Sequence, residues 1–167
     1  MPPPSLMDLY HPGLFRLAGY GGAALFLRSG VVSGGGPHLA VDVGLLTPDD
    51  YGMFLRRPMS PGLSGELARF FFSCASEMNP ELSVASVEDP LSGLELRVLS
   101  STDSEVELEV QVRGEDADGI NFLTSRVALT RAADEVRVLE AAVAEDVRPT
   151  PPMEWRCDGL LLRHLLL

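Results

Sequence analysis

The side chains of this sequence that are best suited to chemistry are the carboxylates of one alternating segment. In GLELRVLSSTDSEVELEVQVRG, residues 93–114, apolar and polar side chains alternate almost without interruption. Its polar positions include four glutamates, Glu95, Glu105, Glu107 and Glu109. A row of carboxylates can bind a basic protein surface, or can exchange protons with a substrate where burial perturbs their pKa values. These glutamates are therefore candidate binding residues.

A second group of carboxylates lies closer to the N-terminus. Asp49 and Asp50 are adjacent in TPDDYG, residues 47–52, and Asp42 lies upstream of them. Neighbouring aspartates can hold a hard cation, but this segment lacks the calcium-loop pattern, and its residues are typical of a polar turn. Asp49 and Asp50 are further candidate binding residues. An enzyme with a dispersed site made of all three aspartates is the alternative to a binding role.

Other kinds of site have little support. The three histidines, His11, His38 and His164, are far apart, and no HxH, HxxxH or CxxC spacing occurs, so neither a metal ion nor another cofactor is expected. No G-x-S-x-G motif and no lysine-containing phosphate loop is present. Cys74 and Cys157 are interpreted as free thiols of a reducing cytoplasm, with Cys74 filling the core. The chain is more consistent with a binding protein than with an enzyme.

The composition narrows the possible partners. The 167 residues carry 24 acidic and 13 basic side chains, a net charge of −11, and every basic one is arginine. A lysine-free composition of this kind suggests a GC-rich genome. The negative charge repels nucleic-acid phosphates and anionic membrane surfaces. The apolar runs are too short to span a bilayer, and the N-terminus lacks a secretory-signal pattern. We therefore expect a cytoplasmic protein without a nucleic-acid or membrane partner.

Hydrophobic periodicity predicts the elements that position the carboxylates. Alternation and turn residues predict strands at 23–32, 38–46, 81–89 and 120–130, and two more within 93–114. Three- and four-residue spacing predicts helices at 60–78 and 130–147, although RFFFSCA within the first is also compatible with a buried strand. The order β-β-α-β-β-β-β-α predicts an α+β fold, a mainly antiparallel sheet of about five or six strands with two amphipathic helices packed on one face.

Within residues 93–114 the alternation also predicts a hairpin register. It places Arg97 opposite Glu109 and Glu95 opposite Gln111, which keeps like charges from facing each other directly. The apolar positions then point toward the core: Leu94, Leu96, Val98, Val106, Leu108, Val110 and Val112. The polar face is either a solvated wall or an acidic docking surface.

The ends of the chain differ from its middle. Residues 1–22 are proline-rich at the start and are expected to form an extended arm, residues 23–147 a single domain, and residues 148–167 a proline-rich linker and an apolar tail. The tail ends in GLLLRHLLL, which carries six leucines. An apolar segment of this kind needs a partner surface. It either folds back over the sheet as a final strand or helix, or crosses to a second copy, and a homodimer closed by the tail is favoured.

Residues 83–147, with the helix before them, resemble a family of small uncharacterised actinobacterial α+β proteins. That family has a helix with a Leu-x-x-Phe face, a Ser-x-Glu-x-x-Leu segment, an alternating strand that ends in arginine, and Val-x-Leu-Thr before a final helix. The matching residues are ELARFFFSCA; Ser86, Glu88 and Leu91; EVELEVQVR, ending at Arg113; and Val127, Leu129 and Thr130. The family's tryptophan-rich stretch is missing at 76–82. The resemblance implies a fold and no particular activity.

A second segment is similar to a different family. VDVGLLTPDDYGMFLRRPMSPGLSG, residues 41–65, resembles the strand, turn and Ser-Gly-Leu region of degenerate viral relatives of dUTPase. Here Pro61 separates Ser60 from Gly62, and no later segment matches the aspartate-bearing uracil loop. This resemblance implies a protein that has lost catalysis. The function that the sequence favours is therefore that of a non-catalytic protein-interaction domain, of the inhibitor or immunity-protein type, with a basic protein partner.

Overall fold

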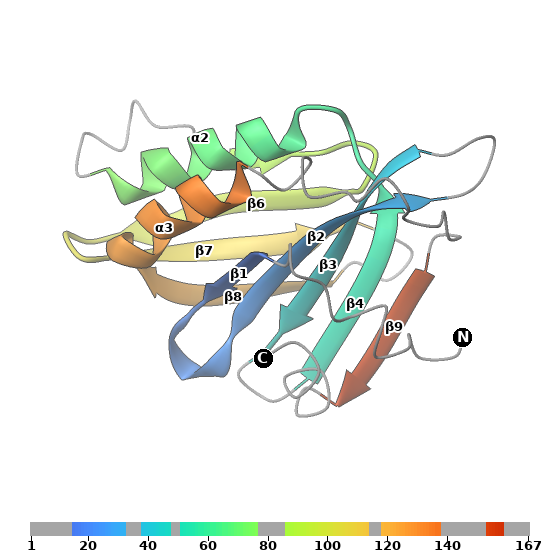
Figure 1. The fold of residues 1–167 in the computed structure, drawn as a ribbon. Helices are drawn as coiled ribbons and strands as arrows, with labels where there is room; N and C mark the ends of the chain where they lie inside the picture. Colours follow the sequence, from blue (N-terminus) through green and yellow to red (C-terminus); the bar gives the residue numbers. More distant parts are fainter. Residues whose placement is uncertain are drawn as a thin grey trace.

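Two antiparallel sheets and two α-helices make up the described part of the protein (Figure 1). In this computed structural model the described residues are 15–32, 38–47, 51–76, 86–113, 118–137 and 153–158. The expected α+β class with mainly antiparallel strands is confirmed. The strands divide into sheets of five and four, where the sequence predicted one sheet of five or six.

Sheet A has the strand order β1-β2-β3-β4-β9. Its strands are β1 (Phe15–Ala18), β2 (Ala24–Val32), β3 (His38–Leu46), β4 (Tyr51–Pro58) and β9 (Met153–Asp158). The predicted hairpin of β2 and β3 is present, and its partners run from Ala24 and Leu46 to Val32 and His38. Strands β1 and β9 lie in the segments expected as arm and tail, and β4 begins inside the predicted turn at 47–52, because Tyr51 and Gly52 already pair with other strands.

Sheet B has the order β5-β6-β7-β8 and contains the alternating segment of the sequence. Its strands are β5 (Ser86–Glu88), β6 (Leu94–Ser101), β7 (Glu105–Val112) and β8 (Asp118–Ser125). The predicted register is confirmed, since Arg97 pairs with Glu109 and Glu95 with Gln111. A bulge interrupts the pairing of β6 with β7 between Val98 and Ser100.

The helices are α2 (Leu63–Ala75) and α3 (Arg126–Val136), and a short 3-10 turn, η1 (Tyr20–Gly22), follows β1. RFFFSCA is helical, as preferred over the strand interpretation. Helix α3 begins earlier than the predicted Thr130, because the Ser125 hydroxyl accepts a hydrogen bond from the Ala128 amide (3.0 Å) and caps the helix there. The predicted end of this helix, 138–147, lies outside the described residues.

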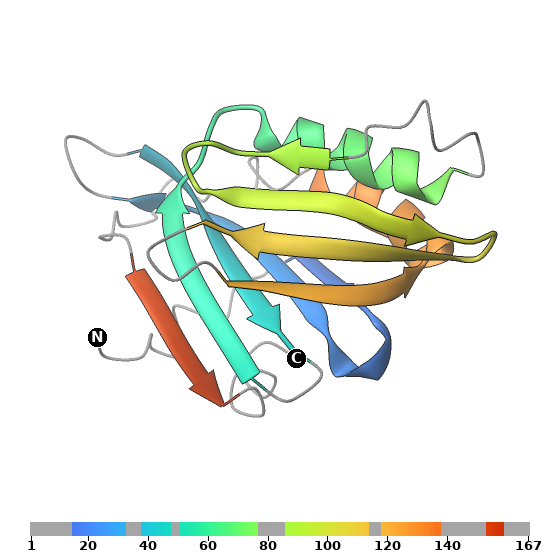
Figure 2. The ribbon, with the colours of Figure 1, turned by 180° about the vertical axis from the view of Figure 1, so that it is seen from behind.

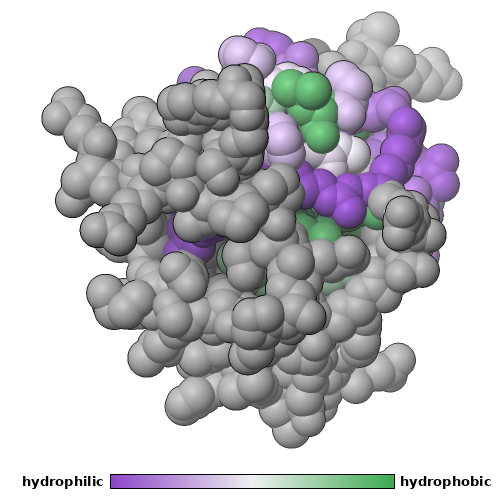
Figure 3. Space-filling view, turned by 90° about the vertical axis from the view of Figure 1, so that its right-hand side faces the viewer, coloured by the Kyte–Doolittle hydropathy of each residue, from purple (hydrophilic) through white to green (hydrophobic). Residues whose placement is uncertain are grey.

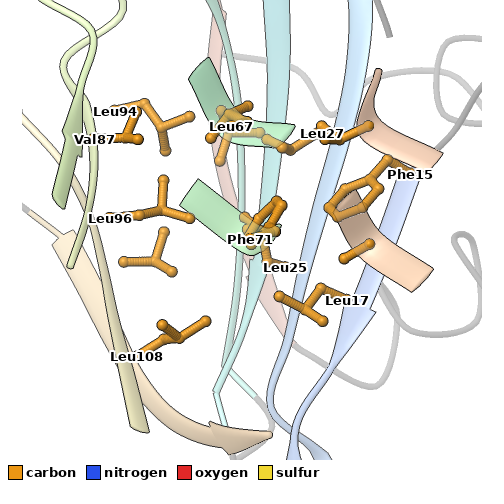
Figure 4. Packing of buried hydrophobic residues seen from close by; sticks show 14 of the residues in the cluster. Phe15, Leu17, Leu25, Leu27, Leu67, Phe71, Val87, Leu94, Leu96 and Leu108 are labelled. Carbon is orange, nitrogen blue, oxygen red and sulfur yellow. The ribbon is translucent and has the colours of Figure 1, made fainter. Parts of the chain in front are cut away.

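One core joins both sheets and both helices. In Figure 4, side chains of sheet A (Phe15, Leu25), of α2 (Leu67, Phe71) and of sheet B, such as Leu96, point toward one another. The rings of Phe15 and Phe71 stack with centroids 5.7 Å apart. The helices pack against each other along one side of the molecule (Figures 1 and 2), and α3 contacts β1 of one sheet and β8 of the other.

The middle strands of sheet A, β2 to β4, are buried on both faces, whereas Arg16 and Ala18 of β1 are exposed. Consecutive residues from Ala24 to Arg28 are all buried, although successive side chains of a strand point to opposite faces. Phe26, Leu46 and Phe54 are almost fully buried but stand outside the core cluster that the two sheets share. They lie on the second face of sheet A, which explains why β4 lacks the alternation by which a half-exposed strand is recognised.

Candidate functional site

The outer face of sheet B carries the glutamates predicted as binding residues. The apolar partners of the hairpin point into the core, where Leu96, Leu108 and Val110 are fully buried, so the intervening side chains face outward. Seen from behind in Figure 2, strands β5 to β8 stand in front and neither of the described helices crosses this face. The alternation of the sequence thus placed Glu95, Glu105, Glu107 and Glu109 on one surface.

Two of these four glutamates are held by arginines of the same face. Arg97 Nε lies 2.5 Å from Glu109 Oε1, and this hydrogen bond and the charge of Glu109 raise the pKa of Arg97 above its usual range. Arg113 Nη2 lies 3.2 Å from Glu95 Oε2 and 2.5 Å from Glu88 Oε1. Exposed pairs of this kind add little stability, but they satisfy the carboxylates that take part. Glu95 and Glu109 are therefore poor anchors for a partner.

The other two glutamates form no ion pair with the described residues. Glu105 and Glu107 are half-buried on β7, two residues apart, and point to the same face. Arg126, which lies beside the β6–β7 turn, donates to carbonyl oxygens and not to Glu105. No arginine within the described ranges occupies their carboxylates, which makes them the better candidates for a partner's donors.

Two exposed leucines flank Glu107. Leu123 of β8 is its register partner on one side. On the other side its partner is Ser100 of β6, and the bulge leaves Leu99 as the extra residue next to Ser100. Leu99 and Leu123 are 41% and 37% exposed. We call Leu99, Glu105, Glu107 and Leu123 the Glu107 patch.

The aspartates predicted as further candidates are not part of this patch. Asp49 and Asp50 lie outside the described residues. The backbone of Asp42 lies in β3, where its register partners are Arg28 of β2 and Arg56 of β4. The structure thus places Asp42 in the other sheet from the four glutamates.

Sequence reasoning missed Arg28 and Arg56, the two arginines that stand beside Asp42 in the register of sheet A. Arg28 and Arg56 are only 4% and 7% exposed, and the Arg28 guanidinium carbon lies 6.0 Å from the centroid of the Phe54 ring. Buried arginine is rare unless it is paired, so these two arginines serve the second face of sheet A as a polar element within an apolar layer. The sequence shows two arginines in apolar segments, but only the strand register reveals that both are buried on the second face of sheet A.

A buried carboxylate, Asp89, joins the two sheets. Its Oδ2 accepts hydrogen bonds from the Ser92 hydroxyl (2.7 Å) and from the Ser60 amide (3.4 Å), which follows β4. Its Oδ1 has no hydrogen-bond partner among the described residues. Arg57 of β4 donates to the Ser92 carbonyl (3.1 Å) in the same turn and also to the Arg113 carbonyl. These contacts fix the turn between β5 and β6 to the end of sheet A.

The described residues hold little else that can do chemistry. Burial raises the pKa of the Cys74 thiol from 9.0 to about 12, against a smaller opposite effect of Arg126, so this thiol stays protonated and is a poor nucleophile. Among these residues no group of three or more His, Cys, Asp or Glu side chains is placed to hold a metal ion. No helix among them is long and apolar enough to cross a membrane.

On the side shown in Figure 3, hydrophilic residues border a small hydrophobic area, so the described surface mixes polar and apolar groups there.

No protein-family model, no curated protein and no solved structure matches the chain. The candidate site is therefore interpreted from its own geometry.

Proposed function

We propose that this protein is a non-catalytic protein-interaction domain that binds a basic protein partner through the outer face of sheet B. The observation that carries the proposal is the Glu107 patch. It combines two glutamates without an ion pair among the described residues with two exposed leucines, on a face that no described helix covers.

The patch has the chemistry of a small protein interface. Residues two apart on a strand are separated by about 7 Å, so Glu105 and Glu107 suit two basic groups of a partner at a similar spacing. Arginine fits best, because its planar guanidinium can donate two parallel hydrogen bonds to one carboxylate. Covering Leu99 and Leu123 removes apolar surface from water, at about 25 cal/mol for each Å².

The charge of the whole chain supports the same kind of partner. A net charge of −11 attracts basic proteins over a distance and raises their association rate, an effect that salt weakens. An inhibitor or an immunity-type protein that covers a basic surface of its target would gain from both the patch and this charge.

A catalytic role has less support. The carboxylates of the patch lie on an open sheet face, whereas active sites are usually concave and partly shielded from water. In the aspartate alternative, Asp42 would stand between Arg28 and Arg56, its register partners. This places the backbone of Asp42 in sheet A, on a different sheet from the glutamates of the patch.

The test uses the full chain as bait and two charge-matched double variants. Glu105→Arg with Glu107→Arg reverses the charge of the patch and keeps its leucines. Glu66→Arg with Glu135→Arg makes the same change of net charge at exposed positions of α2 and α3. Proteins captured from a bacterial lysate are identified by mass spectrometry, then purified and titrated against each form by calorimetry.

The proposal predicts at least one basic protein that binds the wild type and the helix double variant in purified form but loses about tenfold or more in affinity for the patch variant. Glu105→Gln with Glu107→Gln should show the same loss without a repulsive charge. If the patch variant and the helix double variant lose the captured proteins to the same extent, the partners recognise only net charge, and the proposal would fail.

A further inference from the structure

Arg126 connects three segments that are far apart in the sequence. It is the first residue of α3, directly after β8, and its side chain is half-buried. Within the described residues, its guanidinium donates hydrogen bonds to backbone carbonyls alone. Nη1 donates to Cys74 O and Ser76 O (both 2.7 Å), while Nε and Nη2 donate to Thr102 O (2.9 and 2.7 Å).

One end of this connection is the C-terminus of α2. The last carbonyls of a helix have no partners within it, and the helix dipole places negative partial charge there. The Cys74 and Ser76 carbonyls lie at this end, and they take their hydrogen bonds from a cation. The guanidinium is therefore anchored to a helix that is itself packed into the core through Phe70, Phe71 and Cys74.

The other end is the turn between β6 and β7, next to the patch. Thr102, whose carbonyl Arg126 binds, donates its amide to Glu105 O (2.8 Å). Its hydroxyl accepts from the Glu105 amide (3.2 Å). The backbone amide of Arg126 donates to Ser104 O (3.0 Å), so the residue before Glu105 is held as well.

We infer that Arg126 is a positioning residue for the Glu107 patch, an inference that rests on the proposed function. The tip of a hairpin is free to fray unless other elements hold it. Through Thr102 the guanidinium of Arg126 ties the tip to α2, while the backbone amide of the same residue holds Ser104. Together these contacts fix Glu105 beside Glu107 before a partner arrives. Preorganisation of this kind lowers the ordering cost of binding, so removal of Arg126 weakens binding at a residue that does not touch the partner.

The test compares Arg126→Gln with Val87→Ala, which truncates a buried side chain of β5 in the same sheet and away from the turn. Both variants and the wild type are followed by two-dimensional NMR at a temperature where all three are folded. Each is titrated with the peptide Ac-Arg-Gly-Arg-NH2 at low salt, and amide hydrogen exchange is measured at Glu105 in the free proteins. Arg126→Lys is added, because lysine keeps the charge but cannot bridge the same carbonyls in a fixed fork.

In the wild type the peptide should shift the amides of Glu105, Glu107 and their neighbours. Arg126→Gln should weaken the peptide about tenfold and speed exchange at Glu105 by about as much, Arg126→Lys should fall between, and Val87→Ala should change neither. Unchanged affinity in Arg126→Gln, or an equal loss in Val87→Ala, would overturn the positioning role.

The proposed function and this inference fail in different ways. If the wild type shows no peptide shifts at the patch, the basic-partner proposal loses its support. In that case the exchange rate at Glu105 in the free proteins still decides whether Arg126 holds the turn, and an unchanged rate would overturn that step too.

Discussion

Replacement of Leu108 by alanine tests the hairpin register on which the patch depends. Leu108 is 0% exposed, belongs to the core between the sheets and points inward in Figure 4. The substitution deletes three carbons, worth about 2.4 kcal/mol at about 0.8 kcal/mol each. The cavity left between the sheets adds about 1 kcal/mol. We expect the free energy of unfolding to fall by about 3–4 kcal/mol, which is a large part of the stability of an ordinary domain.

The matched variants lie next to Leu108 in sequence or in space. Glu107→Ala changes the preceding residue of β7 on the opposite face, and Leu99→Ala makes the same leucine-to-alanine change at an exposed position of β6. Each should cost less than about 1 kcal/mol, because neither leaves a cavity or breaks an ion pair among the described residues. In the capture experiment the ranking should invert, since both residues belong to the patch.

Urea denaturation followed by circular dichroism measures all three variants under one condition. A slip of the strand by one residue would send Glu107 inward and Leu108 outward. If Glu107→Ala or Leu99→Ala destabilised the protein more than Leu108→Ala, the register would be wrong, and with it the definition of the Glu107 patch.

Three further outcomes are expected. Burial raises the pKa of the Cys74 thiol from 9.0 to about 12, so between these pH values unfolding releases a proton. The free energy of unfolding should therefore fall as pH rises through this range, by at most about 1.4 kcal/mol per pH unit, and urea titrations of Cys74→Ala should lack this slope. Native Cys74 should also react slowly with thiol reagents, and fast reaction would contradict its burial. Gly93→Ala should lower the melting temperature, because Gly93 has φ +77° and a Cβ there would lie 2.9 Å from the Arg113 carbonyl oxygen. The control Gly65→Ala in α2 has room for a methyl group and should stabilise the protein by about 0.5–1 kcal/mol. Equal effects of the two substitutions would show that Gly93→Ala does not strain the backbone. Deletion of residues 159–167 leaves β9 intact and should convert a homodimer to a monomer, which light scattering measures. If the full-length chain is already a monomer and melts no higher than the truncated one, the tail does not close a dimer.

The amino-acid sequence by itself determined those parts of the fold that meet water on one side only. Residues 93–114 alternate because one face of the hairpin packs on the core and the other is solvated, so Leu108 could be placed inside, and Arg97 opposite Glu109, without coordinates. Helix α2 was recognisable for the same reason, since Phe70, Phe71 and Cys74 recur on one buried face while Phe72 is exposed. Periodicity reports burial wherever only one side is buried.

Sheet A shows where that signal disappears. Both faces of β4 are buried, so Phe54 and Leu55 are adjacent apolar residues that follow no period, and the strand had no pattern to reveal it. The division into two sheets likewise depends on which strands find partners. β4 pairs with β9 across a large separation in sequence, and local propensity carries no information about such a pairing.

Tertiary packing also decided which residues of the candidate site have partners. The sequence placed four glutamates on one face, but only the folded chain brings Arg113, from the end of β7, onto Glu95 of the neighbouring strand and leaves Glu105 and Glu107 without an ion pair among the described residues. Arg126 reaches the Cys74 carbonyl 52 positions away because α3 packs against α2. Alternation assigns a residue to a face, while the partner that its charge finds there depends on distances between segments that only tertiary packing sets.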